Sequence, residues 1–255
     1  MELGELVEKK LGEALDLKVV DYCIALSDVY VELAGGYLGL YHTPLEDFAR
    51  FPFRPLLGRS ARDLFTLREE GNMALRALAW AAANAASVPA LRRRTDLLFD
   101  ASPIELLGAK EGDRVLMVGN MGPFAQELAG LGAEVTVLER NPRLRHGALP
   151  DTFIEALPMD FAAAVVTGAA IVVPTFPRLL ELIKAIPNRA IVGPSASLLP
   201  EALHEIGFQL VCGVLVEDVP KMKEWLNQGN FVQGGPGTQT VRELGGAVRT
   251  WCSVR

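Results

Sequence analysis

The segment from Arg114 to Pro142 constrains the fold of this chain more than any other part of the sequence. An apolar run, Val115 to Val118, stops at Gly119, and a segment with helical character follows. A second apolar run, Val135 to Leu138, then ends on Glu139. This order predicts a β-α-β unit, in which a helix joins two parallel strands and the first turn borders a ligand-sized crevice.

The first turn of this unit predicts a site for an anion. A helix that starts there directs its N-terminal amides at a bound anion, and an acidic residue about twenty positions later, here Glu139, can hold a ribose. A complete G-x-G-x-x-G motif would need glycine at Met121 and Phe124, and neither position is glycine. A nucleotide-like ligand at Gly119, Asn120 and Met121 and a purely structural turn therefore remain equal alternatives.

Beyond residue 88, strands and helices alternate, and the strands lack polar alternation. Strands of this kind, rich in valine and isoleucine, are typical of a parallel sheet covered on both faces. The predicted strands are Val115–Val118, Val135–Leu138, Ala162–Thr167, Arg189–Val192 and Gln209–Val216, and the predicted helices are Phe124–Leu131, Phe176–Ala185, Pro200–Glu205 and Val219–Asn227. A final β-like run, Ala247–Val254, could add an edge strand or reach a partner subunit.

The first 88 residues have a different pattern, which predicts a small α+β unit. An amphipathic helix over residues 1–16 precedes three β-like runs at 19–26, 29–33 and 37–41, a helical region that opens at Ser60, and an alanine-rich buried helix over Met73–Ala86. The fold class is thus α/β, with a small α+β domain at residues 1–88 and a mostly parallel sheet domain at 89–255. We expect the boundary between Ser87 and Ser102, where Pro89 and three consecutive arginines lie.

Composition excludes several classes of protein. Half of the residues are hydrophobic, 22% are charged and the net charge is −6, which argues against a nucleic-acid-binding face. No apolar run approaches the roughly 18 residues of a membrane span. The N-terminus reads as an acidic amphipathic helix, unlike a signal sequence. The isolated cysteines Cys23, Cys212 and Cys252 predict free thiols and therefore a reducing cytoplasm.

The ends of the predicted strands supply the candidate binding residues, because ligands of open α/β sheets bind beyond the carboxyl ends of the strands. Each end carries glycine or a polar side chain: Gly119-Asn120, Glu139-Arg140, Thr167-Gly168, Gly193-Pro194-Ser195 and Gly213. A turn explains each glycine taken alone, whereas their joint polarity favours a crevice. Thr175, at the start of a predicted helix, is either part of an anion site or a plain N-cap.

Neither a catalytic triad nor a metal motif is evident. The histidines His42, His146 and His204 lie in three unrelated segments, and no H-x-x-x-H, H-E-x-x-H or C-x-x-C spacing occurs. A metal site would have to assemble from scattered groups such as His42, Glu46, Asp47 or Asp218. Catalysis and catalytic residues therefore remain open.

Several motifs taken together resemble one family. The series GRSARDL from Gly58, the alanine-rich helix with Asn84-Ala85, VLMVGNMGPF, VLERNP, Thr167-Gly168 and IVGPSASLLP is similar to the family named for putative heavy-metal chelation. This resemblance, over roughly residues 4 to 235, implies an enolase N-terminal-like domain followed by a Rossmann-like domain, with a ligand cleft between them. Carried over residue by residue, the cleft would include Asn84 from the first domain and Gly119, Glu139, Thr167, Gly168, Gly193, Pro194 and Ser195 from the second. One departure is Val173-Pro174, where the family has Asn-Gly before the threonine, which removes an amide donor and a flexible glycine.

Three functional hypotheses follow. The first is an enzyme or binding protein for a small anionic or nucleotide-like ligand, or for a metal chelate, in metal or corrinoid-related metabolism. The second is a heavy-metal chelator or metal chaperone without catalysis, and the third is a homo-oligomeric scaffold with a vestigial site. Scarce histidine and cysteine weigh against soft metals, which favour thiolate and imidazole ligands. Carboxylates and water could still bind a hard metal ion or hold a metal that arrives in an organic chelate.

Overall fold

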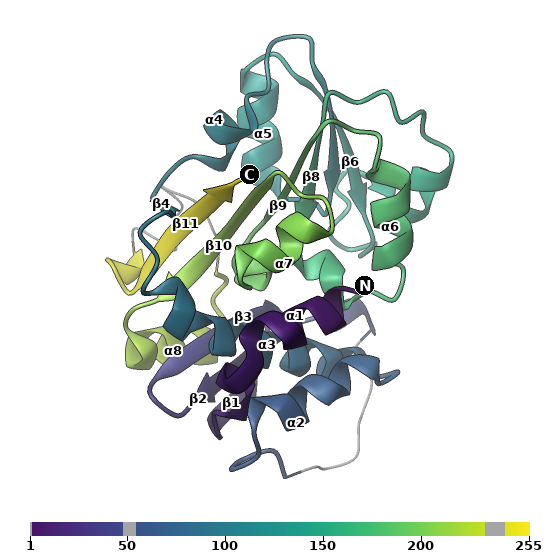
Figure 1. The fold of residues 1–255 in the computed structure, drawn as a ribbon. Coiled ribbons are helices and arrows are strands. Elements are labelled where there is room, and N and C mark those ends of the chain that lie inside the picture. The colour runs from purple at the N-terminus through teal and green to yellow at the C-terminus, as the bar shows by residue number, and fades with distance from the viewer. Residues whose placement is uncertain (1, 48–54, 233–242) are drawn as a thin grey trace.

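The computed structural model describes residues 2–47, 55–232 and 243–255, and these form two sheets with helices around them (Figure 1). One sheet has three antiparallel strands in the order β1-β2-β3. The other has eight strands in the order β4-β11-β10-β9-β8-β5-β6-β7 and is mostly parallel. The predicted α/β class, with a small sheet before a larger parallel one, is confirmed.

The small sheet is a meander of three short strands covered by helices. Glycines at 35 and 36, with φ of 99° and 74°, make the tight turn between its second and third strands, which the glycine pair predicts. Ser60 begins the short helix after the sheet by a reciprocal capping box with Asp63. The elements are α1 (Leu3–Leu11), η1 (Gly12–Asp16), β1 (Val19–Ile24), β2 (Asp28–Leu33), β3 (Tyr37–His42), η2 (Leu45–Asp47), α2 (Ala61–Phe65), η3 (Thr66–Glu69) and α3 (Met73–Leu91).

The alanine-rich helix α3 packs directly on β3. A Cβ atom added at Gly39 would lie 2.1 Å from the carbonyl oxygen of Ala81 and 2.2 Å from the amide nitrogen of Ala85, so the two backbones touch. The helix continues past its predicted end at Ala86 to Leu91, with Pro89 inside it. Pro89 has no N–H and removes one helical hydrogen bond, yet the helix continues to Leu91, whose side chain is fully buried. The division of the chain at residue 88, which falls within α3, stays a prediction.

The large sheet has its five central strands where the sequence predicts them. β5, β6, β8, β9 and β10 are parallel to their neighbours, β11 runs antiparallel to β10, and the short β4 lies outside β11 at the edge. The strands are β4 (Leu98–Phe99), β5 (Arg114–Val118), β6 (Glu134–Glu139), β7 (Leu149–Pro150), β8 (Ala163–Thr167), β9 (Asn188–Val192), β10 (Leu210–Val216) and β11 (Val248–Val254).

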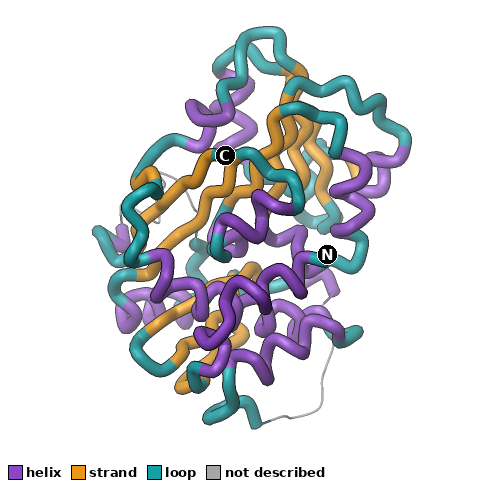
Figure 2. The backbone as a smooth tube through the Cα atoms, in the orientation of Figure 1, coloured by secondary structure: helices purple, strands orange, loops and turns teal. Residues whose placement is uncertain are grey.

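Helices cover both faces of the large sheet (Figure 2). Alternate side chains of β5 serve the two faces: Leu116 joins the cluster that includes α3 and α7, and Val115 and Met117 join the cluster with α4 and α5. Because both faces are buried, the strands read as continuous apolar runs. The connecting elements are α4 (Pro103–Leu107), α5 (Gly122–Gly130), η4 (Asp151–Glu155), η5 (Gly168–Val172), α6 (Phe176–Ile183), η6 (Pro194–Ala196), α7 (Pro200–Glu205) and α8 (Val219–Asn227).

The prediction of free thiols is wrong for two of the three cysteines. Cys212 of β10 and Cys252 of β11 form a disulfide, and Cys23 is free. The two are 40 residues apart in sequence, but the antiparallel pairing of β10 with β11 places them directly opposite each other. No local spacing in the sequence reveals such a pair, because strand register creates it. The argument from free thiols to a reducing compartment therefore no longer holds.

Membrane insertion through a helix has no support in the described part of the chain. None of the helices there combines the length and the apolar character that a membrane span needs.

Candidate functional site

The carboxyl edge of the large sheet brings several of the candidate residues together. The strand order changes direction between β5 and β8, and ligand crevices of open α/β sheets lie at such a switch. Gly119 and Thr167 end these two strands, and a Cβ atom at Gly119 would lie 2.4 Å from the Thr167 methyl group. Gly119 also has φ of +94°. Glycine is thus required here for both space and conformation.

The carboxylate of Glu139 holds the turn between β5 and α5. Its Oε2 accepts from the Asn120 amide at 2.8 Å, and its Oε1 accepts from the Asn141 amide at 2.7 Å. A ribose hydroxyl would have to replace or share these bonds. The structure therefore places Glu139 beside the turn, as the sequence predicts, and its role as a ribose acceptor stays a prediction.

A loop rich in arginine, residues 141–148, lies against the same turn. The side chain of Asn120 donates to the carbonyl oxygens of Leu144 at 2.7 Å and Arg145 at 3.3 Å. The guanidinium of Arg145 in turn donates to the carbonyls of Glu139 and Arg140. Arg143 is exposed on this loop. Asn120 therefore links the loop that carries Arg143 and Arg145 to the N-terminal turn of α5, whose N-cap residue is Met121.

Asn84 and Ser195 meet between the two sheets, but in a closed contact. The Asn84 amide donates to the carbonyls of Leu40 at 2.7 Å and Ser195 at 3.3 Å, and Asn84 is fully buried. The Ser195 hydroxyl accepts from the backbone N–H of His42 at 3.0 Å. A Cβ atom at Gly168 would lie 2.4 Å from the amide nitrogen of Ala196. These residues join the two halves of the chain by direct contacts, and their role in lining a ligand cleft stays a prediction.

Tyr41 makes a second junction that the sequence did not indicate. Its hydroxyl donates to the carbonyls of Gly168 at 2.9 Å and Ala169 at 3.1 Å, and accepts from the Val172 amide at 2.9 Å. Arg76 on α3 donates to the Val172 carbonyl at 2.8 Å. Burial of the Tyr41 hydroxyl raises its pKa far above the ordinary value, so it stays a neutral hydrogen-bonding group. A tyrosine in an apolar strand gives no sequence signal of this role.

Asp28 is a buried carboxyl group close to the same junction. It lies directly opposite His42 in the pairing of β2 with β3 and is 4% exposed. Burial raises the pKa of Asp28 to about 6, and His42, a hydrogen bond from Ser27 and the Val232 amide oppose that rise. The sequence offered one signal for this group, because Asp28 begins an apolar strand. An aspartate in such a strand is rarely buried without a partner, so its position points to a paired carboxyl group.

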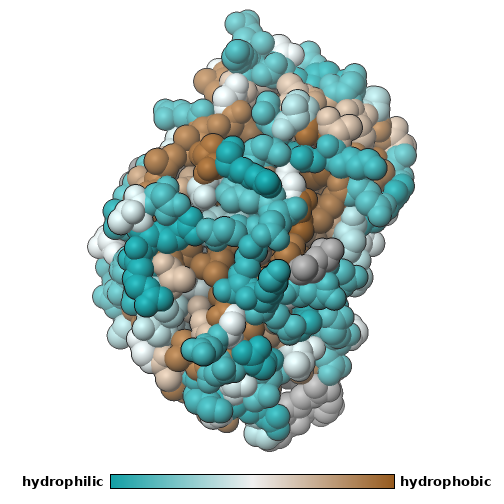
Figure 3. Space-filling view, in the orientation of Figure 1, coloured by the Kyte–Doolittle hydropathy of each residue, from teal (hydrophilic) through white to brown (hydrophobic). Residues whose placement is uncertain are grey.

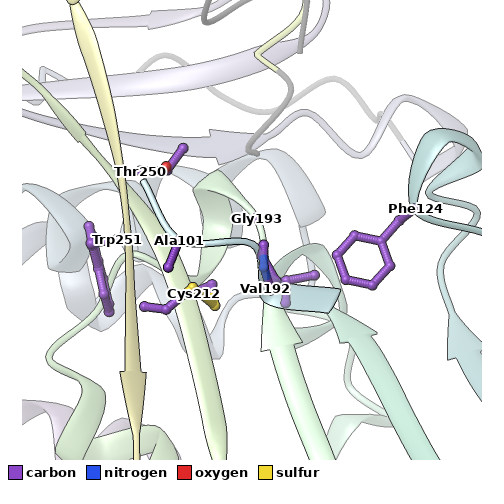
Figure 4. A pocket seen from close by; sticks show the side chains of 10 residues that line it. Ala101, Phe124, Val192, Gly193, Cys212, Thr250 and Trp251 are labelled. Atoms are coloured by element: carbon purple, nitrogen blue, oxygen red, sulfur yellow. A yellow bond between two sulfur atoms is a disulfide. The ribbon is translucent and has the colours of Figure 1, made fainter. Parts of the chain in front are cut away.

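Gly193 lines a small cavity at the end of β9 (Figure 4). Its volume is about 20 Å³, enough for one or two water molecules. Phe124 of α5, Val192 and the disulfide between Cys212 and Cys252 contribute to the lining. Gly193 has φ of +110°, so a side chain there would be strained. Pro194 follows it and opens η6.

The two candidate threonines behave differently. Thr167 caps η5, because its hydroxyl accepts from the Ala169 amide at 3.4 Å. Thr175 is exposed at the start of α6 and makes no capping bond with its side chain. The two residues before Thr175 are Val173 and Pro174, which depart from the family pattern. Val173 is the C-cap of η5, and Pro174 is exposed. Thr175 is thus not joined to the residues around Gly119.

Metal ligands do not gather in the described part of the chain. No group of three or more histidine, cysteine or acidic side chains there is placed to hold an ion. The candidates His42, Glu46 and Asp47 lie at the end of β3 and in η2, but Glu46 contacts Asn141 and Asp47 pairs with Arg140. Asp218 instead caps α8 through the Lys221 amide.

Comparison with known proteins identifies the family. Two family models, both described as putative heavy-metal chelation, match residues 7–87 and residues 102–237. The chain belongs to this heavy-metal chelation family. The resemblance of the motifs around Gly58, Asn84, Gly119 and Thr167 is thereby confirmed. An uncharacterised protein of Methanocaldococcus jannaschii is 27% identical over 213 residues, which cover 81% of this chain and 82% of that protein.

Two crystal structures of proteins of unknown function from the heavy-metal chelation family share the fold. The one from Pyrococcus horikoshii has a TM-score of 0.83 and 24% identity, with all of both chains covered. The one from Desulfitobacterium hafniense has a TM-score of 0.80 and 22% identity, over 99% of this chain and 98% of that chain. At these identities the likeness concerns the fold.

Proposed function

We propose that this protein binds a small anionic molecule, either a nucleotide-like ligand or a carboxylate-bearing metal chelate, at the carboxyl edge of the large sheet. The carrying observation is the bond from the Asn120 side chain to the arginine-rich loop 141–148. Through this bond, positive side chains and the N-terminal turn of α5 belong to one local structure. Both features favour an anion.

The charge at this place supports an anionic ligand. The carboxylate of Glu139 accepts two backbone amides, and the Arg145 guanidinium donates to the backbone carbonyls of Glu139 and Arg140. Arg143 is exposed. Gly122 and Phe124 at the start of α5 carry amides without an acceptor inside the helix, whereas Pro123 between them has no N–H. A phosphate or carboxylate group between these two amides and the loop would meet N–H donors and the positive side chains of the loop.

The family description favours the metal chelate over the nucleotide. A metal that arrives inside an organic complex is recognised mainly through that complex, so the protein needs anion-binding groups more than a full set of ligands. A chelator or metal chaperone without catalysis would use the same edge.

The test is isothermal titration calorimetry with defined probes. We expect cobalt citrate or iron citrate to bind the wild-type chain more tightly than free cobalt, AMP, NAD or S-adenosylmethionine. Asn120→Ala frees the loop and should weaken binding about ten-fold, which corresponds to about 1.4 kcal/mol. Arg143→Gln should weaken it two- to five-fold, the range for an exposed ion pair of about 0.5–1 kcal/mol.

The matched control is Arg178→Gln, which removes an exposed arginine on α6 that pairs with Glu155 and Glu181. It should leave binding unchanged. The proposal fails if none of the probes binds the wild type at millimolar concentration, or if Asn120→Ala binds as the wild type does. We also expect a homo-oligomer, and light scattering that gives a mass of 27.6 kDa would refute this.

A further inference from the structure

A groove among the described residues lies away from the carboxyl edge. It has a volume of about 560 Å³, within the range of small-molecule sites. Its walls come from distant parts of the chain: the end of α1 and η1, the last two turns of α3, the start of β3 and the residue before α7. The lining residues are Lys10, Leu11, Glu13, Ala14, Leu17, Tyr37, Ala86, Pro89, Ala90, Arg93 and Leu199.

The floor of this groove, which we call the α3 groove, is apolar. Pro89 and Ala90 present small, partly exposed side chains from one face of α3, with the fully buried Ala86 beneath them, and Leu199 closes one wall. Figure 3 shows hydrophobic surface surrounded by hydrophilic residues where Figure 1 draws the end of α3 beside α1 and α7. Larger residues at positions 86 and 90 would fill this space. The small alanine side chains of α3 therefore have two effects. They let the helix pack closely on β3 near Ala81 and Ala85, and they leave an open groove near Ala90.

Positive charge lies at the mouth of the α3 groove. Arg93 follows the C-terminus of α3 and is exposed, and Lys10 lies on the facing helix. The neighbouring arginines have structural partners: Arg92 donates to the Val216 carbonyl and Arg94 pairs with Asp96 and Glu201. Lys10 pairs with Glu205. In the described part of the chain Arg93 is thus the member of the arginine cluster whose guanidinium has no such partner.

Glu13 sets a limit on the charge of an occupant. Its side chain is exposed on the rim, so one carboxylate lies among the same lining residues as the cations Lys10 and Arg93. Because Glu205 already compensates Lys10, the remaining local charge is small. A polyanion such as a nucleotide would meet Glu13 with little net attraction, whereas a single negative group beside Arg93 avoids that repulsion.

We propose that the α3 groove binds an amphipathic monocarboxylate, with its apolar body on Pro89, Ala90 and Leu199 and its carboxylate beside Arg93. The apolar body of such a ligand matches the apolar floor of the groove, and its single negative charge matches Arg93 at the mouth. A medium-chain fatty acid has this chemistry. The site shares no residue with the proposed anion site at Asn120, so each can fail without the other.

The experiment titrates the full chain with decanoate and, as its uncharged match, decanol, by calorimetry. We expect one molecule of decanoate to bind at micromolar to millimolar concentration, and decanol to bind more weakly. Ala90→Phe fills the groove and should reduce decanoate binding at least ten-fold. Arg93→Gln should weaken decanoate two- to five-fold and leave decanol unchanged, because it removes only an exposed charge.

The control for the filling variant is Ala129→Phe, which adds the same side chain at an exposed position on α5. Circular dichroism of both variants establishes that they are folded, and Arg93→Gln tests the mouth without altering the packing. Decanoate binding that persists in Ala90→Phe would overturn the proposed location. Equal binding of decanoate and decanol by the wild type, or no binding at millimolar concentration, would overturn the proposed ligand class.

Discussion

The hydroxyl of Tyr41 should be worth about 3 kcal/mol to this fold, and Tyr41→Phe tests that value. The change removes one oxygen atom from the junction between β3 and η5 and keeps the ring that fills the core. Tyr41 is fully buried, and so are Gly168 and Val172, which bond to its hydroxyl. After the change, the carbonyls of Gly168 and Ala169 and the amide of Val172 lose the bond to the hydroxyl and keep only the backbone bonds within η5.

The magnitude follows from the three hydrogen bonds of the hydroxyl. One intramolecular hydrogen bond contributes about 0.5–1.5 kcal/mol net. Three such bonds contribute about 1.5–4.5 kcal/mol, and we take the middle value of about 3. For a urea dependence near 3 kcal/mol per molar, the unfolding midpoint should fall by about 1 M.

The assay is equilibrium unfolding in urea, followed by far-ultraviolet circular dichroism. Tyr22→Phe is the matched control, since no hydrogen bond of the Tyr22 hydroxyl is found in the described residues; it should change stability by less than about 0.5 kcal/mol. Hydrogen exchange of the Val172 amide gives a local readout, and this amide should exchange faster in Tyr41→Phe. Stability within about 0.5 kcal/mol of the wild type, with unchanged protection of Val172, would refute the reasoning.

Three further changes test other contacts of the fold. Burial raises the pKa of Asp28 from 3.8 to about 6, so the native state binds the carboxyl proton more tightly than the unfolded state does. The free energy of unfolding should therefore fall by about 3 kcal/mol as the pH rises from 4 to above 6. Asp28→Asn should remove that dependence in urea titrations at several pH values. Gly39→Ala forces a Cβ atom into the backbone of α3 and should cost about 3 kcal/mol or more, whereas Gly71→Ala, with open space around it, should be near neutral in the same unfolding assay. Reduction of the disulfide between Cys212 and Cys252 should lower stability by about 2–4 kcal/mol, as measured by unfolding with and without dithiothreitol; an unchanged midpoint after complete alkylation would contradict this.

Local sequence pattern was sufficient to predict the longer strands and helices of the large sheet, whereas the short elements β4, α4 and β7 were not predicted. The run Val115–Val118 became the inner part of β5, and Pro200–Glu205 and Val219–Asn227 are helices with the predicted bounds. These elements are set by apolar periodicity and by capping residues, and both act over a few positions. The alanine-rich helix ran five residues beyond its predicted end because tertiary packing offset the local effect of Pro89.

Long-range contacts were largely beyond the reach of the sequence. The Cys212–Cys252 bond depends on the register of β10 with β11, and the hydroxyl of Tyr41 finds its partners more than 120 residues away. Asn84 was expected near the second half of the chain through the family resemblance, and it does contact Ser195. The helix that carries Asn84 was predicted to be buried, but the closed contact of its side chain was not foreseen, because motif similarity locates a residue without giving its hydrogen-bond partners.

The contacts of Asn84 and Tyr41 suggest how the two candidate binding places are related. Both side chains bind carbonyl groups of the turns after β8 and β9, so they fix these turns against β3 and close the junction there. A ligand at the carboxyl edge must then approach from the side of Asn120 and loop 141–148, where the surface is only partly covered. The α3 groove lies along the C-terminal part of α3, the helix that also carries Asn84, and Leu199 in its wall lies three residues beyond η6. Ser195 lies in η6, and Leu199 follows it closely in the chain. A shift of η6 would therefore be transmitted to the carboxyl edge and to the α3 groove. Asn84→Ala should therefore alter binding at the edge and in the groove together, whereas Arg93→Gln should affect the groove alone.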